Sequence, residues 1–137
     1  MPNYFYKDEN KTEIKDNLLT VEAKKIADSF FNPKTGKPIL SSSQLRKFYN
    51  EIKSLENKIN FEAKEFSVIF PLIKMIKSKL EYASNPKKKG KIPNEFKYFM
   101  SNCIDNIEDD KDFKAFKLHL EAVLGYYYGR GVKEWNL

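Results

Sequence analysis

Residues 41–59, SSSQLRKFYNEIKSLENKI, constrain the fold most, because two independent signals of a helix coincide there. Ser41 stands three residues before Gln44, the spacing of a capping box that satisfies free backbone N–H groups at a helix start. At 100° per residue the apolar side chains that follow lie within about 120° of arc. The stretch therefore predicts an amphipathic helix whose buried face consists of Leu45, Phe48, Tyr49, Ile52, Leu55 and Ile59.

The opposite side of this predicted helix is basic and rich in amides, and it carries Arg46 and Lys53 with Lys47 beside them. A solvated charged face is the ordinary explanation for such a pattern. The alternative is a helix that docks by its apolar face and offers Arg46 and Lys53 to a phosphate backbone. Only two arginines occur in the chain, and the planar fork of a guanidinium suits phosphate.

The rest of the chain also has a helical period and no strand period. Apolar stripes predict further helices, and two prolines and a glycine within residues 33–38 separate the first of them from the helix at 41–59. We therefore expect an all-α fold, a compact bundle of about five helices joined by short loops. The further helices are expected at 18–31, 61–83, 93–107 and 108–129, with Gly129 as the C-cap of the last.

The third helix has an unusually wide apolar arc, because Val68, Leu72 and Met75 lie beside its main stripe. Such a helix is expected to be central in the bundle and packed on two sides. Pro71 removes one backbone hydrogen bond from the middle of this helix. We expect it either to kink the helix or to split it in two.

The chain of 137 residues fits one domain, expected over 1–137, in which residues 1–17 form a loose arm. Cys103 is the single cysteine, so no intramolecular disulfide is possible and a reducing compartment is expected. The N-terminus has no apolar signal core. The longest apolar run, 68–73, is too short to span a bilayer. We expect a cytoplasmic protein with no membrane contact.

Few residues suit catalysis or metal binding. His119 is the only histidine and is expected at the surface or its boundary, whereas Cys103 is expected in the core. The acidic cluster at 108–112 could bind a divalent ion, but its spacing is not that of a calcium loop and helix capping explains it more simply. No glycine-rich phosphate loop occurs. We therefore expect no enzyme, no metal and no cofactor.

Charge is unevenly distributed in this chain, whose net charge is +6. Between residues 74 and 91 there are seven lysines and one acidic residue, while 93–137 hold eight acidic against six basic residues. Lysines of this kind give affinity for phosphates without sequence specificity. Tyrosines at 82, 98 and 126–128 either stack on bases or fill the core. The candidate phosphate contacts of this region are Lys74, Lys77, Lys79, Lys87, Lys88, Lys89 and Lys91.

Residues 42–49, SSQLRKFY, resemble the signature of the small helical subunit of type III-A CRISPR effector complexes, the Csm small subunit. Two further stretches are similar to that family. Residues 79–83, KLEYA, resemble the close of its central helix, and residues 121–127, EAVLGYY, resemble its C-terminal helix. The resemblance covers the chain from about residue 18 onward.

This resemblance implies a non-catalytic role. Several copies of the subunit line the inside of the complex and hold the duplex of guide RNA and target RNA without reading its sequence. The implied partners are guide RNA, target RNA, the backbone and large subunits, and neighbouring copies of the chain. Arg46 and Lys47 of the matched motif are the implied RNA contacts, and Lys53 follows one heptad later. Two other hypotheses stay open: a helical protein–protein adaptor that binds no nucleic acid, and a small enzyme or toxin.

Overall fold

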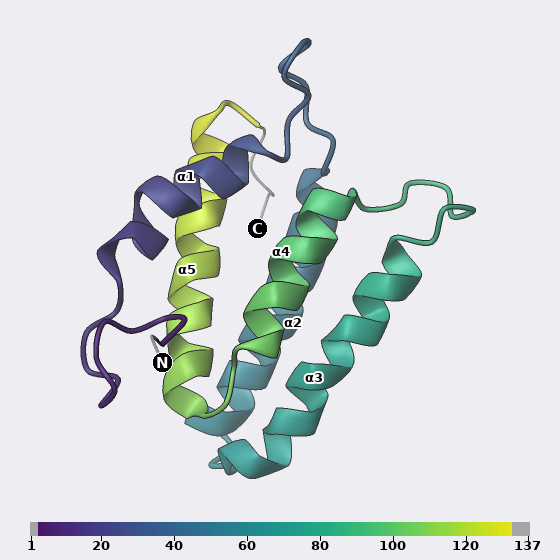
Figure 1. Cartoon of the computed structure of the whole chain (residues 1–137). Coiled ribbons are helices and arrows are strands. Elements are labelled where there is room, and N and C mark those ends of the chain that lie inside the picture. The colour runs from purple at the N-terminus through teal and green to yellow at the C-terminus, as the bar shows by residue number, and fades with distance from the viewer. Residues whose placement is uncertain (1–2, 133–137) are drawn as a thin grey trace.

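A computed structural model of the chain describes residues 3–132 as helices joined by irregular loops (Figure 1). Within those residues, extended pairing is limited to two isolated bridges, Tyr6–Ile14 and Phe31–Pro38. The expected all-α fold is confirmed, and no helix of the described part is long and apolar enough to cross a membrane. The elements are a 3₁₀ helix, η1 (Asp16–Leu19), and the α-helices α1 (Val21–Asp28), α2 (Ser42–Asn60), α3 (Phe66–Ala83), α4 (Asn94–Asp105) and α5 (Asp110–Gly129).

The helix α5 holds the two sides of the molecule together. Both η1 and α1 pack against it, α2 contacts α5 and α3, and α3 packs against α4 (Figure 1). Aromatic rings fill the centre: the ring of Phe96 lies 5.6 Å from that of Phe30 and 5.5 Å from that of Phe48. Edge-to-face pairs of this kind add to the stabilisation that burial of the rings supplies. The core thus joins the segment after α1 to α2 and α4.

The sequence signals of α2 are confirmed. Ser41 is the N-cap, its Oγ accepts the backbone N–H of Gln44, and the Gln44 side chain accepts the N–H of Ser41 in return. The predicted apolar face is turned into the core, with Ile59 only partly buried at the far end. Capping and periodicity are both local properties, which is why the sequence alone predicts this helix well.

A single helix over 18–31 is wrong. Thr20, with φ −130° and ψ −98°, lies outside the helical region and separates η1 from α1. At the other end the helix stops at Asp28. There the N–H groups of Phe30 and Phe31 donate to carbonyls three residues earlier, and both rings are buried. The chain leaves the regular helix at this point, and both consecutive aromatic side chains lie in the core.

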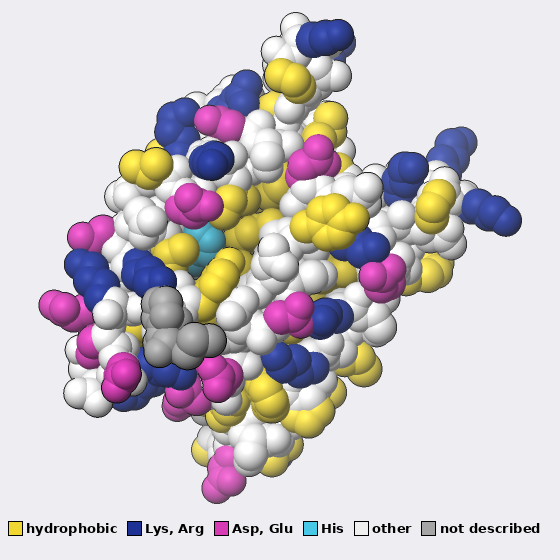
Figure 2. Space-filling view, viewed as in Figure 1, with side chains coloured by type: hydrophobic (Ala, Val, Ile, Leu, Met, Phe, Trp, Pro, Cys, Tyr) yellow, Lys and Arg dark blue, Asp and Glu magenta, His cyan; other side chains and the backbone are white. Residues whose placement is uncertain are grey.

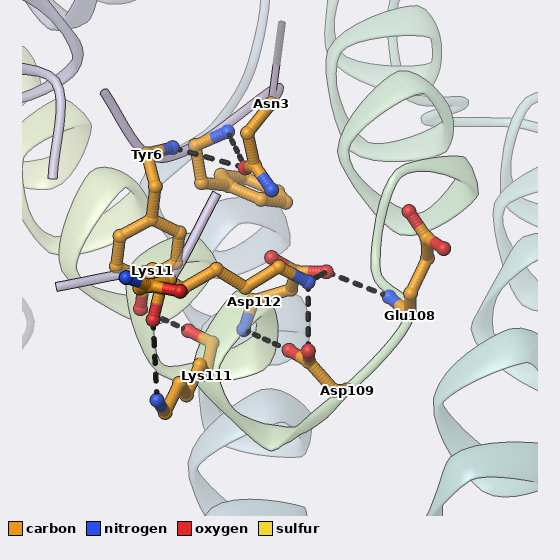
Figure 3. A network of polar contacts seen from close by, with 9 residues as sticks. Asn3, Tyr6, Lys11, Glu108, Asp109, Lys111 and Asp112 are labelled. Carbon is orange, nitrogen blue, oxygen red and sulfur yellow. Dashed lines mark hydrogen bonds and ion pairs between the residues drawn. The ribbon is translucent and has the colours of Figure 1, made fainter. Parts of the chain in front are cut away.

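The loose arm expected at the N-terminus is wrong for residues 3–17, while residues 1–2 lie outside the described part. The ring of Phe5 is fully buried, and the Tyr6 hydroxyl donates to the carbonyl of Lys111. Figure 3 shows the Lys11 ammonium directed at two carboxylates near the start of α5: Lys11 Nζ lies 2.7 Å from Asp109 Oδ2 and 2.9 Å from Asp112 Oδ2. Apolar burial and an ion pair therefore bind this segment to α5.

The helix α3 is not central, and that expectation is wrong. It lies at the edge of the molecule (Figure 1), and the side chains that widen its apolar arc stay in solvent: Val68 is 59% exposed, Leu72 38% and Met75 49%. Only one stripe of α3 is buried, against α2 and α4. The helix continues through Pro71 as one element, so the proline does not split it. It begins at Phe66, five residues later than predicted.

The two ends of α5 give different outcomes. Capping explains the acidic start, because Asp109 is the N-cap and its Oδ1 accepts the N–H of Asp112 at 2.9 Å. Gly129, in contrast, is the last helical residue and Arg130 is the C-cap, so the predicted C-cap is wrong by one position. Gly131 follows with φ +95°, a conformation that glycine adopts without steric cost.

His119 is buried, and its expected place at the surface is wrong. Only 1% of it is exposed, its ring packs edge-on against Phe99, and its Nδ1 bonds to the carbonyl oxygen of Leu18. Because a carbonyl can only accept, Nδ1 carries the proton. Cys103 lies in the core as predicted, and burial raises the pKa of its thiol to about 12. Neither group is poised to react with a substrate in solution.

Mild acid is expected to destabilise the fold through His119. Burial lowers the pKa of His119, and the hydrogen bond to Leu18 only partly offsets this. The unfolded chain, in which the histidine pKa is about 6.5, then binds more protons than the folded chain, so the free energy of unfolding falls as pH drops below that value. Urea denaturation between about pH 7 and pH 5 measures this slope.

The chain has one histidine, so His119→Phe is a direct control. The slope in this pH window should disappear in the variant, which keeps an aromatic ring beside Phe99. A slope that persists in His119→Phe would show that another group titrates there.

Candidate nucleic-acid interface

The loop at 85–91 leads from α3 to α4 and also contacts the start of α2. The Gln44 amide nitrogen donates to the carbonyl of Gly90 at 2.6 Å, which ties this loop to the α2 N-terminus. The N–H of Ile92 donates to the carbonyl of Ala83 and closes the loop at its base. Gly90 has φ +69°, a backbone conformation that glycine adopts without the steric cost that a Cβ atom would add. The contact between Gln44 and Gly90, which are 46 residues apart in sequence, thus brings the basic loop next to the basic start of α2.

We call the lysines of this region the basic corner: Lys47 on α2 with Lys87, Lys88, Lys89 and Lys91 of the loop. All except Lys88 are exposed, and Lys88 is half-buried. Figure 2 shows lysine side chains projecting from the loop between α3 and α4 (dark blue, right). Positive charges that project from a loop can reach the phosphates of a polyanion without further rearrangement of the fold.

Lys79 lies close to the basic corner but has a partner of its own. It lines a groove between α2 and α3 together with Lys47 and Tyr82, and its ammonium pairs with the carboxylate of Glu51. This pair is partly exposed, so it is worth little to stability. A phosphate at the groove would therefore meet Lys79 already partly neutralised.

Two other candidate lysines of α3 point to the opposite side of that helix. Lys74 Nζ donates to the carbonyl of Ile104 at 2.6 Å, and burial lowers the pKa of Lys74. The ammonium of Lys77 pairs with Asp105. Both lysines therefore bind α3 to the end of α4, and the structure does not bring them together with the basic corner.

Arg46 keeps its predicted position outside the buried face of α2, but its side chain packs on two aromatic rings. It lies about 60° from Tyr49 around the helix and turns toward α5. Its guanidinium lies 5.7 Å from the ring centre of Tyr49 and 5.2 Å from that of Tyr128, and its Nε donates to the Tyr128 hydroxyl at 3.1 Å. Arg46 thus helps to hold α2 against α5, and replacing it would test packing as well as RNA contact.

Lys53 is exposed on α2, on the same side as Arg46 and about 120° around the helix from Lys47. The structure therefore divides the predicted contacts of α2 between two sides. Lys47 joins the basic corner, whereas Arg46 and Lys53 face the α5 side.

Sequence reasoning missed two residues that organise this region. Gln44 was interpreted only as part of a capping box, yet its amide nitrogen also holds the basic loop. Tyr128 was grouped with its neighbours, yet its hydroxyl contacts both Arg46 and Ser42. A glutamine at the N3 position indicates capping only. The contacts of Gln44 with Gly90 and of Tyr128 with Arg46 are long-range, and no local sequence pattern predicts them.

Fold and surface together define a small all-α protein with a lysine-rich corner at one end of its helices. A family model described as Csm2 Type III-A matches residues 13–130. The chain therefore belongs to the Csm2 family, a structural small subunit of type III-A CRISPR complexes. No curated protein and no solved structure matches the chain. The resemblance drawn from residues 42–49 is thus confirmed.

Proposed function

We propose that the chain is a non-catalytic, RNA-binding structural subunit of a type III-A CRISPR ribonucleoprotein. In this role it lies along the duplex of guide RNA and target RNA and contacts phosphates without reading their sequence. The observation that carries the proposal is the basic corner, because Gln44 ties the loop with its four lysines to the helix α2 that carries Lys47. Family membership supplies the ribonucleoprotein to which this surface would belong.

The chemistry of the basic corner suits a phosphate backbone better than base edges. Lysine is a compact point charge on a flexible stem, whereas bidentate reading of bases is the task of arginine. Contacts to phosphates position a protein on a nucleic acid but carry no sequence information. Base pairing between guide and target would supply the specificity.

The positions of the reactive residues support a role without catalysis. His119 and Cys103 are buried, so neither side chain can reach a substrate. In residues 3–132 no group of three or more His, Cys, Asp or Glu is arranged to hold a metal ion. Asp109 and Asp112 of the acidic cluster are occupied by capping and by Lys11.

The partners that follow from this proposal are guide RNA and target RNA, the backbone and large subunits, and neighbouring copies of the chain. Such an assembly would work in the cytoplasm. Lys53, Arg46 and the α3 lysines Lys74, Lys77 and Lys79 remain secondary candidates for RNA contact, because they lie outside the basic corner or have partners within the chain.

A filter-binding titration of the purified chain tests the proposal. Unrelated single-stranded RNAs and a guide–target duplex should bind with similar affinity. Binding should fall steeply between about 50 and 200 mM salt, since each phosphate contact releases counterions. The proposal would be overturned if the isolated chain retained no RNA at low salt and the assembled complex gave no cross-link between this subunit and RNA.

A helical adaptor that binds only protein is the second candidate. The exposed apolar stripe of α3, formed by Val68, Leu72 and Met75, favours it because such stripes are typical of protein contacts. A chain that enters the complex without any contact to RNA would support this candidate.

A further inference from the structure

The groove between α2 and α3 has an apolar base and a cationic edge. It encloses about 420 Å³, and its walls include Phe48 and Ala83 of the two helices and the side chain of Tyr82. Lys47 stands on the α2 side of this opening. The only carboxylate in the lining, that of Glu51, is paired with Lys79. A flat apolar group with an attached anion would match these walls.

Tyr82 is the exposed aromatic residue of the groove. It is 69% exposed at the end of α3, and the ammonium of Lys88 lies 4.7 Å from its ring centre. This ring lies outside the core, whereas Tyr127 is fully buried and Tyr128 holds Arg46. Of the tyrosines that the sequence offers for stacking, Tyr82 combines exposure, a groove and adjacent cations.

Charge favours a nucleotide over a peptide as the occupant. Four of the five residues at 87–91 are lysine, and this loop continues from the groove past Lys88. A nucleic-acid strand carries one phosphate per nucleotide, so a strand leaving the groove would meet these lysines in succession. Exposed aromatic rings beside cationic tracks are the usual platforms for unpaired bases.

We infer that this groove is a stacking site for one unpaired nucleotide of a bound RNA, with its base against Tyr82 and its phosphates beside Lys47 and Lys88. The inference rests on the proposed function, since it requires RNA at the basic corner. It goes further in assigning a contact to a base, which duplex backbone contacts alone do not provide. The site accepts any base, because every base has a π-face.

The test uses three RNA duplexes that differ at one position. One is fully paired, one carries a single bulged 2-aminopurine, and one carries an abasic residue at the bulge. The bulged base should bind about tenfold more tightly than the abasic duplex, and its fluorescence should be quenched on binding. Tyr82→Ala should abolish both effects, and Tyr82→Phe should keep them.

Tyr98→Ala is the matched control. Tyr98 is 58% exposed and also has a lysine near its ring, Lys97 at 6.0 Å, but it lies outside the groove lining. This variant should bind all three duplexes like the wild type. Equal affinity for bulged and abasic RNA, or quenching that survives Tyr82→Ala, would overturn the inference while the proposed function stands. Failure to bind even the paired duplex at low salt would overturn the inference, and the RNA-binding function would fall with it if the assembled complex also gave no cross-link between this subunit and RNA.

Discussion

Replacement of Lys11 by methionine is expected to lower the free energy of unfolding by about 3 kcal/mol. The Lys11 side chain is 14% exposed, and that of its partner Asp112 only 2%. Methionine retains the apolar stem but leaves the Asp112 carboxylate buried without its cation. Breaking a buried pair on one side costs far more than the pair contributes net, because the remaining charge stays desolvated. Urea denaturation followed by circular dichroism measures the loss.

A surface pair in the same segment provides the control. Lys7 pairs with Asp16 at 3.2 Å, but these side chains are 47% and 85% exposed. Exposed pairs contribute about 0–1 kcal/mol, so Lys7→Met should change stability little. If Lys7→Met and Lys11→Met had the same effect, the ion pair at the start of α5 would not hold the N-terminal segment.

A double variant separates the ion pair from the packing of the segment. Asp112→Asn removes the buried charge and keeps an oxygen that can accept the N–H of Glu108, which Asp112 Oδ2 accepts at 3.0 Å. Combined with Lys11→Met, it should recover part of the lost stability, since no uncompensated carboxylate then remains at that position. Additive losses in the double variant would show that the two residues act independently.

The Lys11 network also shows why part of the fold cannot be predicted from the sequence. Lys11 lies 98 and 101 residues away from its two partners, and the bond between His119 and Leu18 spans 101 residues. No local spacing marks such contacts. The segment at 3–17 lacks a helical or strand period of its own, so its burial against α5 depends on tertiary contacts. The helix α2, whose cap and period are local, shows the opposite case.

The error at α3 has a different origin. Val68, Leu72 and Met75 widen the apolar arc as a buried helix would, but the chain places α3 at its edge. An apolar arc indicates that a surface favours burial, and it does not say whether the chain itself or a partner covers it. The sequence therefore predicted the helix correctly and its surroundings wrongly.

The candidate site was predictable in composition and not in arrangement. The lysine run at 87–91 and the motif containing Lys47 are both visible in the sequence, but their proximity depends on the bond from Gln44 to Gly90. Arg46 was expected to face away from the core because its wheel position was judged without a neighbouring helix. The packing of α5 beside α2 adds the ring of Tyr128 to that of Tyr49, which lies on α2 itself, and the guanidinium packs on both.

Conversion of three loop lysines to glutamine, Lys87, Lys89 and Lys91, is expected to weaken RNA binding by about 100-fold near 0.1 M salt. Each phosphate contact that is lost removes nearly one unit from the slope of log affinity against log salt, so the slope should become shallower by about 2 to 3. All three side chains are exposed, and stability should therefore change by less than about 0.5 kcal/mol. Filter binding at several salt concentrations measures both quantities.

The matched variant removes the same charge from elsewhere on the surface. Lys25, Lys64 and Lys114 are likewise exposed, and they lie on α1, before α3 and on α5. Their conversion to glutamine lowers the net charge from +6 to +3, as the loop variant does. A local site predicts a large loss for the loop variant and a loss several-fold smaller for the matched one. Equal losses would mean that RNA responds only to the overall charge, and the basic corner would then not be the contact surface.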